Sequence, residues 1–358
     1  MNSSASPPGG PAATGISIAV CCHNSAARLA PTLGHLADQR GIPGFPWEVL
    51  VIDNASTDRT ADIARETWPP AAAAPLRVIP EPRPGLQFAR ARAFDSARYP
   101  VVSFIDDDNW VDPDWIRLVW EILSARADVG ACGGRSEAEC EVPPPGWFPS
   151  WAHCYAVGPQ GPPNEEPAGE RPQLWGAGLS IRRSAWTGLV AGGFRPLLQD
   201  RQGQRLLSSG DDELSLALRL AGWRLWYDSR LRLKHFLPAP RLAWSYLRRL
   251  HRGFGLSLTD AYWFALGEGI GRCPDYRKSW FWVCLRQLWY VARILPTVLE
   301  LRNPAAGEGD GRILEAEERV GRLQALWSAR WDYRRHRRWV ATAPWRGSRS
   351  RGEPVPPR

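Results

Sequence analysis

Lysine is almost absent from this chain, because Lys234 and Lys278 are its only lysines. Arginine therefore supplies nearly all of the positive charge, and the net charge is +8 over 358 residues. Together with 33 prolines and 20 tryptophans, this bias is of the kind that a GC-rich genome produces. A basic composition of this origin is weak evidence for a nucleic-acid partner, and we expect none.

Long apolar runs and paired cysteines are missing as well. No uninterrupted run reaches about 18 apolar residues, so we expect no membrane-spanning helix. Residues 1–15 have neither a basic start nor an apolar core, which predicts a disordered tail and not a signal peptide. The seven cysteines form no C-x-x-C pair, which argues against a disulfide framework or a zinc knuckle. A reducing, cytoplasmic compartment is the expectation.

Short apolar runs alternate with helical patterns in the first third of the chain. Runs that are apolar throughout indicate strands buried on both faces, so we predict an α/β fold with a mostly parallel sheet covered by helices. The predicted strands are 16–20, 48–52, 76–79 and 101–105, and the predicted helices are 27–38, 58–67 and 86–98. Ligands bind such sheets beyond the carboxyl ends of the strands. Polar residues stand at those ends, namely His23, Asn24, Asp53 and 106–108.

Three adjacent aspartates, Asp106, Asp107 and Asp108, end the fourth predicted strand. Their charges repel one another and lower stability unless a counter-ion is present. A divalent cation with oxygen ligands would meet that need. The alternative is a solvated acidic loop that caps the next helix, with Asp112 as N-cap before Pro113. The triplet alone leaves both interpretations open.

The run FIDDDN, in a chain that opens with a strand and a His-Asn turn, resembles the Asp-x-Asp signature of family 2 glycosyltransferases. Four further segments are similar to motifs of that family and follow in the same order: ISIAVCCHN, VLVIDNASTDRT, PRPGLQFARAR and SSGDDELSLALRLAGWRLWYDSRLRLKH. The resemblance covers residues 16–237 and implies the GT-A fold, a nucleotide-binding α/β sheet joined to an acceptor-binding half.

The resemblance also implies roles for individual residues. Asp108 would bind a metal ion, Mn²⁺ or Mg²⁺, together with Asp106 and His235. Asp212 would be the catalytic base of an inverting transfer, with Asp211 beside it. The nucleotide sugar, most commonly a UDP-sugar in this family, would contact seven positions: Cys22, His23, Asn24, Asp53, Arg90, Asp106 and Asp107.

Three positions depart from the family pattern. His23 replaces the common Tyr, Ala91 replaces a frequent Asn, and Asp211 stands where the late motif usually has Glu. The last change shortens the side chain by one methylene and keeps the carboxylate, so it affects the assignment of roles more than the activity. Trp175 and Gly178 precede an apolar strand and form a candidate acceptor floor, although a core Trp beside a turn fits the pattern equally well.

The chain after residue 240 changes to helices dense in Trp and Arg. Within 280–301 the pattern is apolar nearly all round, with Arg286 and Arg293 on one face. Packing on the catalytic domain is the favoured interpretation, and a helix lying on an anionic membrane is the other. The predicted division is a GT-A catalytic domain over 16–240, a helical extension over 241–302, and a linker, charged helix and basic tail over 303–358.

These features predict a metal-dependent inverting glycosyltransferase of polysaccharide or cell-envelope biosynthesis. We expect a glycan or lipid-linked acceptor, and a cytoplasmic site with peripheral contact to the inner face of the membrane. A nucleotidyltransferase is an alternative, but it would need a Gly-rich phosphate loop and a Lys after the first strand, which CCHNSAARL lacks. A non-catalytic nucleotide-sugar or membrane-surface binding protein on the same fold is the other alternative. A dehydrogenase would need G-x-G-x-x-G there, which is also missing.

Overall fold

The structure is a computed structural model of the chain. It describes residues 14–40, 43–162, 164–167, 173–198, 209–301, 303 and 307–347. The predicted tail over 1–15 therefore lies almost wholly outside the described residues, as do parts of the predicted linker and the end of the basic tail.

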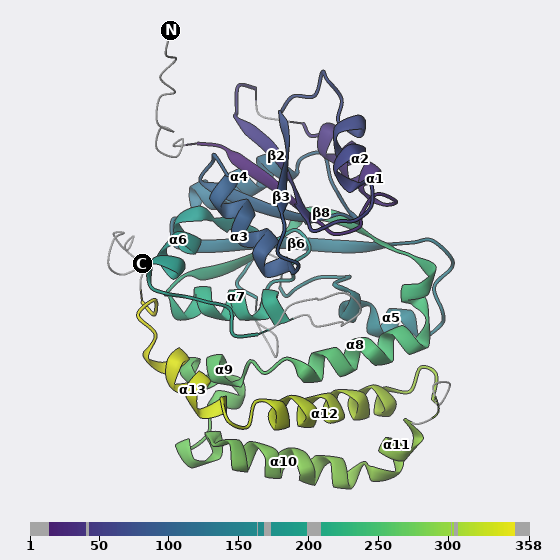
Figure 1. Cartoon of the computed structure of the whole chain (residues 1–358), viewed down its shortest axis with the longest axis vertical. Helices are drawn as coiled ribbons and strands as arrows, with labels where there is room; N and C mark the ends of the chain where they lie inside the picture. Colours follow the sequence, from purple (N-terminus) through teal and green to yellow (C-terminus); the bar gives the residue numbers. More distant parts are fainter. Residues whose placement is uncertain are drawn as a thin grey trace.

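One mixed sheet forms the centre of the molecule (Figure 1). In the described residues its strand order is β3-β2-β1-β4-β7-β6-β8-β5. The strands are β1 (Ile16–Cys22), β2 (Trp47–Asn54), β3 (Leu76–Glu81), β4 (Val101–Asp106), β5 (Asn109–Val111), β6 (Val129–Cys140), β7 (Ser180–Arg182) and β8 (Arg224–Leu237). The first four strands in this order, β3, β2, β1 and β4, are parallel to their neighbours, and β6 is parallel to β8. Strand β7 is antiparallel to both β4 and β6, and β5 is antiparallel to β8. The predicted mostly parallel α/β fold is confirmed.

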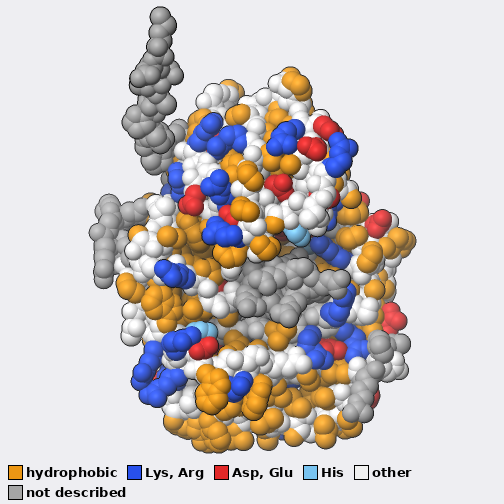
Figure 2. All heavy atoms as spheres, in the orientation of Figure 1, with side chains coloured by type: hydrophobic (Ala, Val, Ile, Leu, Met, Phe, Trp, Pro, Cys, Tyr) orange, Lys and Arg blue, Asp and Glu red, His pale blue; other side chains and the backbone are white. Residues whose placement is uncertain are grey.

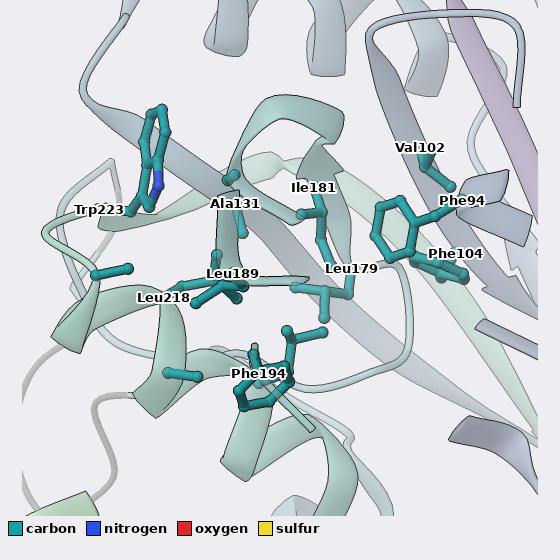
Figure 3. Packing of buried hydrophobic residues seen from close by; sticks show 14 of the residues in the cluster. Phe94, Val102, Phe104, Ala131, Leu179, Ile181, Leu189, Phe194, Leu218 and Trp223 are labelled. Carbon is teal, nitrogen blue, oxygen red and sulfur yellow. The ribbon is translucent and has the colours of Figure 1, made fainter. Parts of the chain in front are cut away.

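Helices cover both faces of the sheet, as the continuous apolar strands predicted. Ile16, Ile18 and Val20 of β1 point to one face, where α1 (Leu29–Ala37), α2 (Thr60–Thr67) and α4 (Trp115–Ala125) close a buried cluster. The other face packs against α3 (Leu86–Ser96), α6 (Arg183–Ala191) and α7 (Ser209–Leu220). Figure 3 shows part of that second cluster, with Phe94 of α3 against Phe104 of β4. The sheet is thus held rigidly, and its strand ends have fixed positions.

Some predicted boundaries were wrong. Helix α4 begins at Trp115, and Asp112 accepts the Trp115 N–H through its backbone carbonyl, so Asp112 is not the N-cap. Helix α7 begins at Ser209 and carries Asp211 and Asp212 in its first turn. The end of the late motif forms one long strand, β8, which pairs with β6 along most of its length.

The C-terminal helices stack below the sheet in the order α8 (Trp244–Leu256), α12 (Gly311–Ser328) and α10 (Trp280–Arg293) (Figure 1). Gly255 and Gly321 lie where these two helices, α8 and α12, meet, and a Cβ on either would collide with the other helix's backbone. Across the same contact, Glu317 accepts hydrogen bonds from Arg248 and Arg252. The predicted continuous helices are broken, since α11 (Leu295–Glu300) follows α10 and α13 (Tyr333–Thr342) follows α12.

The end of the described chain returns to the catalytic half. Trp345 is fully buried and packs against Phe194 and Tyr262, the latter on α9 (Asp260–Leu266). The Gly347 N–H donates to the Leu220 carbonyl at 3.1 Å. The first part of the predicted basic tail, up to Gly347, is therefore ordered and packed against the catalytic half. No helix among the described residues is long and apolar enough to cross a bilayer. The domain boundaries at 240 and 302 stay a prediction.

Candidate active site

A cavity of about 1350 Å³ opens at the carboxyl ends of β1 and β4 and reaches the C-terminal helices. Most of the predicted site residues line it: Cys22, His23, Arg90, Asp106, Asp107, Asp108, Trp175, Asp211, Asp212 and His235. They come from β1, the β4–β5 turn, α3, α7, β8 and the segment before β7. Asn24, Asp53 and Gly178 are not among the residues that line this cavity.

Asp108 and His235 meet because β5 pairs with β8 in the register that sets Asn109 opposite His235. The His235 Nε2 lies 3.6 Å from Asp108 Oδ1. The His235 Nδ1 lies 2.8 Å from the Tyr155 carbonyl oxygen, which can only accept, so Nδ1 carries the proton and donates. In the neutral ring Nε2 therefore keeps a lone pair directed toward Asp108.

Arg241 is a site residue that the sequence did not reveal. It lies on η2 (Ala239–Leu242), just after β8, and its Nη1 is 2.9 Å from Asp108 Oδ2 and 3.4 Å from His235 Nε2. The guanidinium thus lies between the Asp108 carboxylate and the His235 ring and neutralises the charge of Asp108. No sequence signal marked it, because its contact depends on where β8 ends.

The three adjacent aspartates point to different places. Asp106 ends β4 deep in the cavity, where burial and the nearby charges of Asp108 and Asp211 raise its pKa to about 6. Asp107 instead turns toward the start of α1, where Ser25 donates to its carboxylate and Arg28 Nη2 lies 2.7 Å away. Burial raises the pKa of Asp107 as well, against the pull of Arg28. Asp106 and Asp108 are therefore the two carboxylates of this strand end that lie close enough for the charge of Asp108 to raise the pKa of Asp106.

Arg90 and Asp211 form a second charged pair at the cavity wall. Arg90, on α3, is buried and donates through Nη2 to the Asp211 carboxylate in the first turn of α7. That carboxylate packs against Gly176, where any Cβ would collide with it. The neighbouring Asp212 lies in the same turn, where backbone N–H groups stabilise negative charge. Asp211 therefore forms the ion pair with Arg90, and Asp212 is the neighbouring carboxylate on the cavity wall.

The turn after β1 shapes the opposite side. His23 Nδ1 is 2.7 Å from the Asn54 carbonyl oxygen, and burial raises the pKa of the Cys22 thiol, which stays neutral. Asn24 has φ of 50° and accepts the Thr57 N–H, so its side chain joins two loops. Asp53, at the end of β2, has one buried carboxylate oxygen, Oδ1, that finds no hydrogen-bond partner among the described residues.

The two tentative acceptor residues differ in position. Trp175 lines the cavity, and its backbone N–H donates to Gln160 at 2.6 Å. Gly178 has φ of +75°, and a Cβ there would lie 2.6 Å from the indole of Trp115, so this residue is packed behind the wall. Further wall residues from α8, α9, α10 and α12 were not predicted: Tyr246, Leu250, Phe254, Trp263, Gln287, Tyr290 and Arg322.

The donor set around Asp108 suits a hard divalent cation. Carboxylate oxygens suit Mn²⁺ and Mg²⁺, and neutral imidazole nitrogen is a common metal ligand in proteins. Among the described residues, however, no three His, Cys, Asp or Glu side chains are grouped closely enough to hold a metal ion. Asp108 and His235 therefore fit as part of a metal site, provided that Arg241 moves away from Asp108.

Comparison with known proteins agrees with the motifs. Residues 17–183 match the model of glycosyl transferase family 2. That segment carries a glycosyl transferase family 2 domain. The resemblance drawn from the motifs is confirmed, and with it the class of transferase enzymes. Asp211, Asp212 and His235 lie beyond the matched segment.

Relatives within the family are distant. The Bacillus subtilis protein EpsH, which is described as a glycosyltransferase, is 27% identical over 92 residues, 26% of each chain. Escherichia coli chondroitin synthase is 28% identical over 123 residues, which is 34% of this chain and 17% of that protein. The aligned segments thus span about a quarter or less of these relatives.

Solved structures of similar shape include S. aureus TarS 1–349, at 14% identity and a TM-score of 0.45, covering 88% of this chain and 91% of that one. A structure of GalNAc-T7 with UDP, GalNAc and Mn²⁺ has 16% identity and a TM-score of 0.49, covering 74% and 54%.

Proposed function

We propose that this family 2 protein transfers a sugar from a nucleotide-sugar donor, a UDP-sugar by family expectation, to a hydroxyl of a glycan or lipid-linked acceptor, with inversion. The observation that carries the proposal is the convergence of Asp106, Asp108, Asp212 and His235 on one cavity from three separate parts of the chain. We place the reaction at the cytoplasmic side of the membrane.

The donor side of the cavity is rich in groups that suit a nucleoside diphosphate. The unpartnered Asp53 Oδ1 can accept an N–H of a base, provided that the base reaches behind the His23 turn. Arg90, Arg28 and Arg241 line the same cavity and can attract phosphate oxygens. Mn²⁺ or Mg²⁺, held by Asp108 and His235 with Asp106 nearby, would supply Lewis-acid stabilisation of the leaving diphosphate.

Asp212 would act on the acceptor. Its carboxylate takes the proton from the acceptor hydroxyl while that oxygen bonds to C1 of the sugar and the C1–O bond to the diphosphate breaks. Asp211 keeps Arg90 in place. Trp175 offers an aromatic face for the acceptor sugar at the same cavity.

Substitution of Asp212 by Asn tests the proposal. We expect donor affinity close to that of the wild type, measured by calorimetry, and a fall in transfer of roughly 10²–10⁴-fold, because the base is lost. The matched change Asp211→Asn weakens the hold on Arg90 and should lower donor affinity instead. Full transfer by the Asp212→Asn variant would remove this residue from the role of base.

A further inference from the structure

Helix α10 has polar residues and the buried Val283 on its inward side, and a largely apolar side toward solvent. Arg286, Gln287 and Tyr290 line the far end of the cavity, and Gln287 is buried. Arg319 of α12 stacks over Tyr290, with its Cζ 4.4 Å from the ring centroid. A helix that only packed on a catalytic domain would turn its apolar face inward. Val283 does pack inward, in a buried apolar cluster, but five large apolar side chains of α10 lie on the outward side, and packing on the domain does not account for them.

The outward face of α10 and α11, termed the apolar face, is continuous. It consists of Phe281, Trp282, Leu285, Leu288, Trp289, Leu295 and Leu299, each between 42% and 62% exposed. Figure 2 shows hydrophobic side chains gathered along the lower edge of the molecule, where Figure 1 places α10. Single exposed apolar residues need no explanation, but a contiguous stripe of this kind marks a surface that meets another apolar phase.

Arginines stacked on tryptophans border the apolar face. The Arg293 Cζ lies 4.6 Å from the Trp289 ring centroid, and that of Arg330 lies 4.9 Å from Trp327. Trp327 ends α12 beside the start of α10, because Trp280 Nε1 donates to the Leu326 carbonyl at 2.7 Å. Glu300 is the sole acidic side chain in the sequence of α10 and α11. The border is thus aromatic and cationic.

We propose that the apolar face docks on a lipid bilayer with anionic headgroups. Apolar side chains would enter the acyl region, while tryptophans and arginines stay at headgroup depth. A second copy of this chain is the weaker occupant, because a two-fold interface sets the same surface against itself and so brings like charges together. Anionic headgroups instead neutralise the cationic border.

The docked orientation has a consequence for the acceptor. The apolar face and the cavity-lining residues are opposite sides of one helix, whose diameter is about 10–12 Å. A docked bilayer therefore lies about one helix diameter from the far end of the cavity. This step rests on the proposed sugar transfer: if the protein catalyses it while docked, the acceptor is one carried by a membrane lipid.

Vesicle flotation of the full chain tests the docking surface. We expect the protein to float with vesicles of phosphatidylcholine and phosphatidylglycerol, and at least tenfold less with phosphatidylcholine alone or in high salt. The Leu285→Ser/Leu288→Ser variant should bind roughly a hundredfold more weakly, because it loses two large apolar side chains from the bilayer contact. The matched control Val142→Ser/Val190→Ser removes exposed apolar residues elsewhere and should float as the wild type does.

Two further readouts keep the outcomes separate. If the double variant does not fold, Arg293→Ala/Arg330→Ala replaces it and should reduce the preference for anionic vesicles. Nucleotide-sugar affinity without vesicles should not change in either variant, so a chain that floats but binds no donor would contradict the transferase proposal alone. Wild-type protein that floats with neither vesicle, or that dimerises through this face in solution, would overturn the docking surface.

Discussion

Removal of the Arg241 guanidinium should destabilise the metal-free protein and strengthen its response to divalent cations. Arg241→Met leaves Asp108, whose side chain is 5% exposed, without its nearest cation while Asp106 stays close. Loss of one partner from a buried pair costs about 3–5 kcal/mol. Because the Arg241 side chain is 23% exposed, we expect about 2 kcal/mol. That corresponds to a Tm lower by roughly 5 °C.

Thermal unfolding in EDTA and in a series of Mn²⁺ concentrations measures both effects. Mn²⁺ should raise the Tm of Arg241→Met more than that of the wild type, because the Arg241 guanidinium no longer competes for Asp108 and His235. Arg241→Lys keeps the charge and should resemble the wild type. Arg117→Met breaks only exposed ion pairs and should change stability by under about 1 kcal/mol. Equal Tm values for Arg241→Met and wild type in EDTA, or equal shifts with Mn²⁺, would refute the reasoning.

Three further predictions concern stability. Glu317→Gln should lower the free energy of unfolding, measured by chemical denaturation, by about 3 kcal/mol, because the buried Arg248 guanidinium loses its carboxylate partner. Gly178→Ala should lower the free energy of unfolding by about 2 kcal/mol and the Tm by several degrees. The reason is that Gly178 has a φ of +75° and that Trp115 and Leu233 occupy the space a Cβ would need. Hydrogen bonds from Arg83 lower the pKa of Glu81, so its stabilisation is complete above about pH 4.5 and is lost as the pH falls through the lowered pKa. The Tm difference between Glu81→Gln and wild type should shrink accordingly in acid, and a constant difference would contradict this.

Much of the catalytic half could be predicted because local rules decide it. Apolar strands, helix periodicity and polar residues at strand ends follow from the order of residues along the chain. The directions of adjacent side chains do not follow so readily. Asp106 and Asp107 are neighbours and both line the cavity, yet Asp106 lies near Asp108 and Asp211 whereas Asp107 is held by Ser25 and Arg28. The sequence did not reveal that Asp107 has its own counter-ion.

The missing part of the site comes from distant packing. Arg241 reaches Asp108 because of the length of β8, and the wall formed by α8, α10 and α12 depends on how these helices stack. The sequence left two interpretations of the 280–301 segment, packing or membrane contact. In the structure Gln287 faces inward and Leu288 faces out, so one helix offers a surface for each.

Transfer from a nucleotide sugar is the central claim, and a donor panel tests it most directly. The full chain with Mn²⁺ would be incubated with individual nucleotide sugars, and both the Tm and the released nucleotide would be measured. The account predicts that at least one donor, most simply a UDP-sugar, raises the Tm and releases nucleotide, and that Asp212→Asn keeps the Tm shift while losing the release. Neither stabilisation nor release with any donor would contradict it, and binding without release would indicate a non-catalytic nucleotide-sugar binding protein.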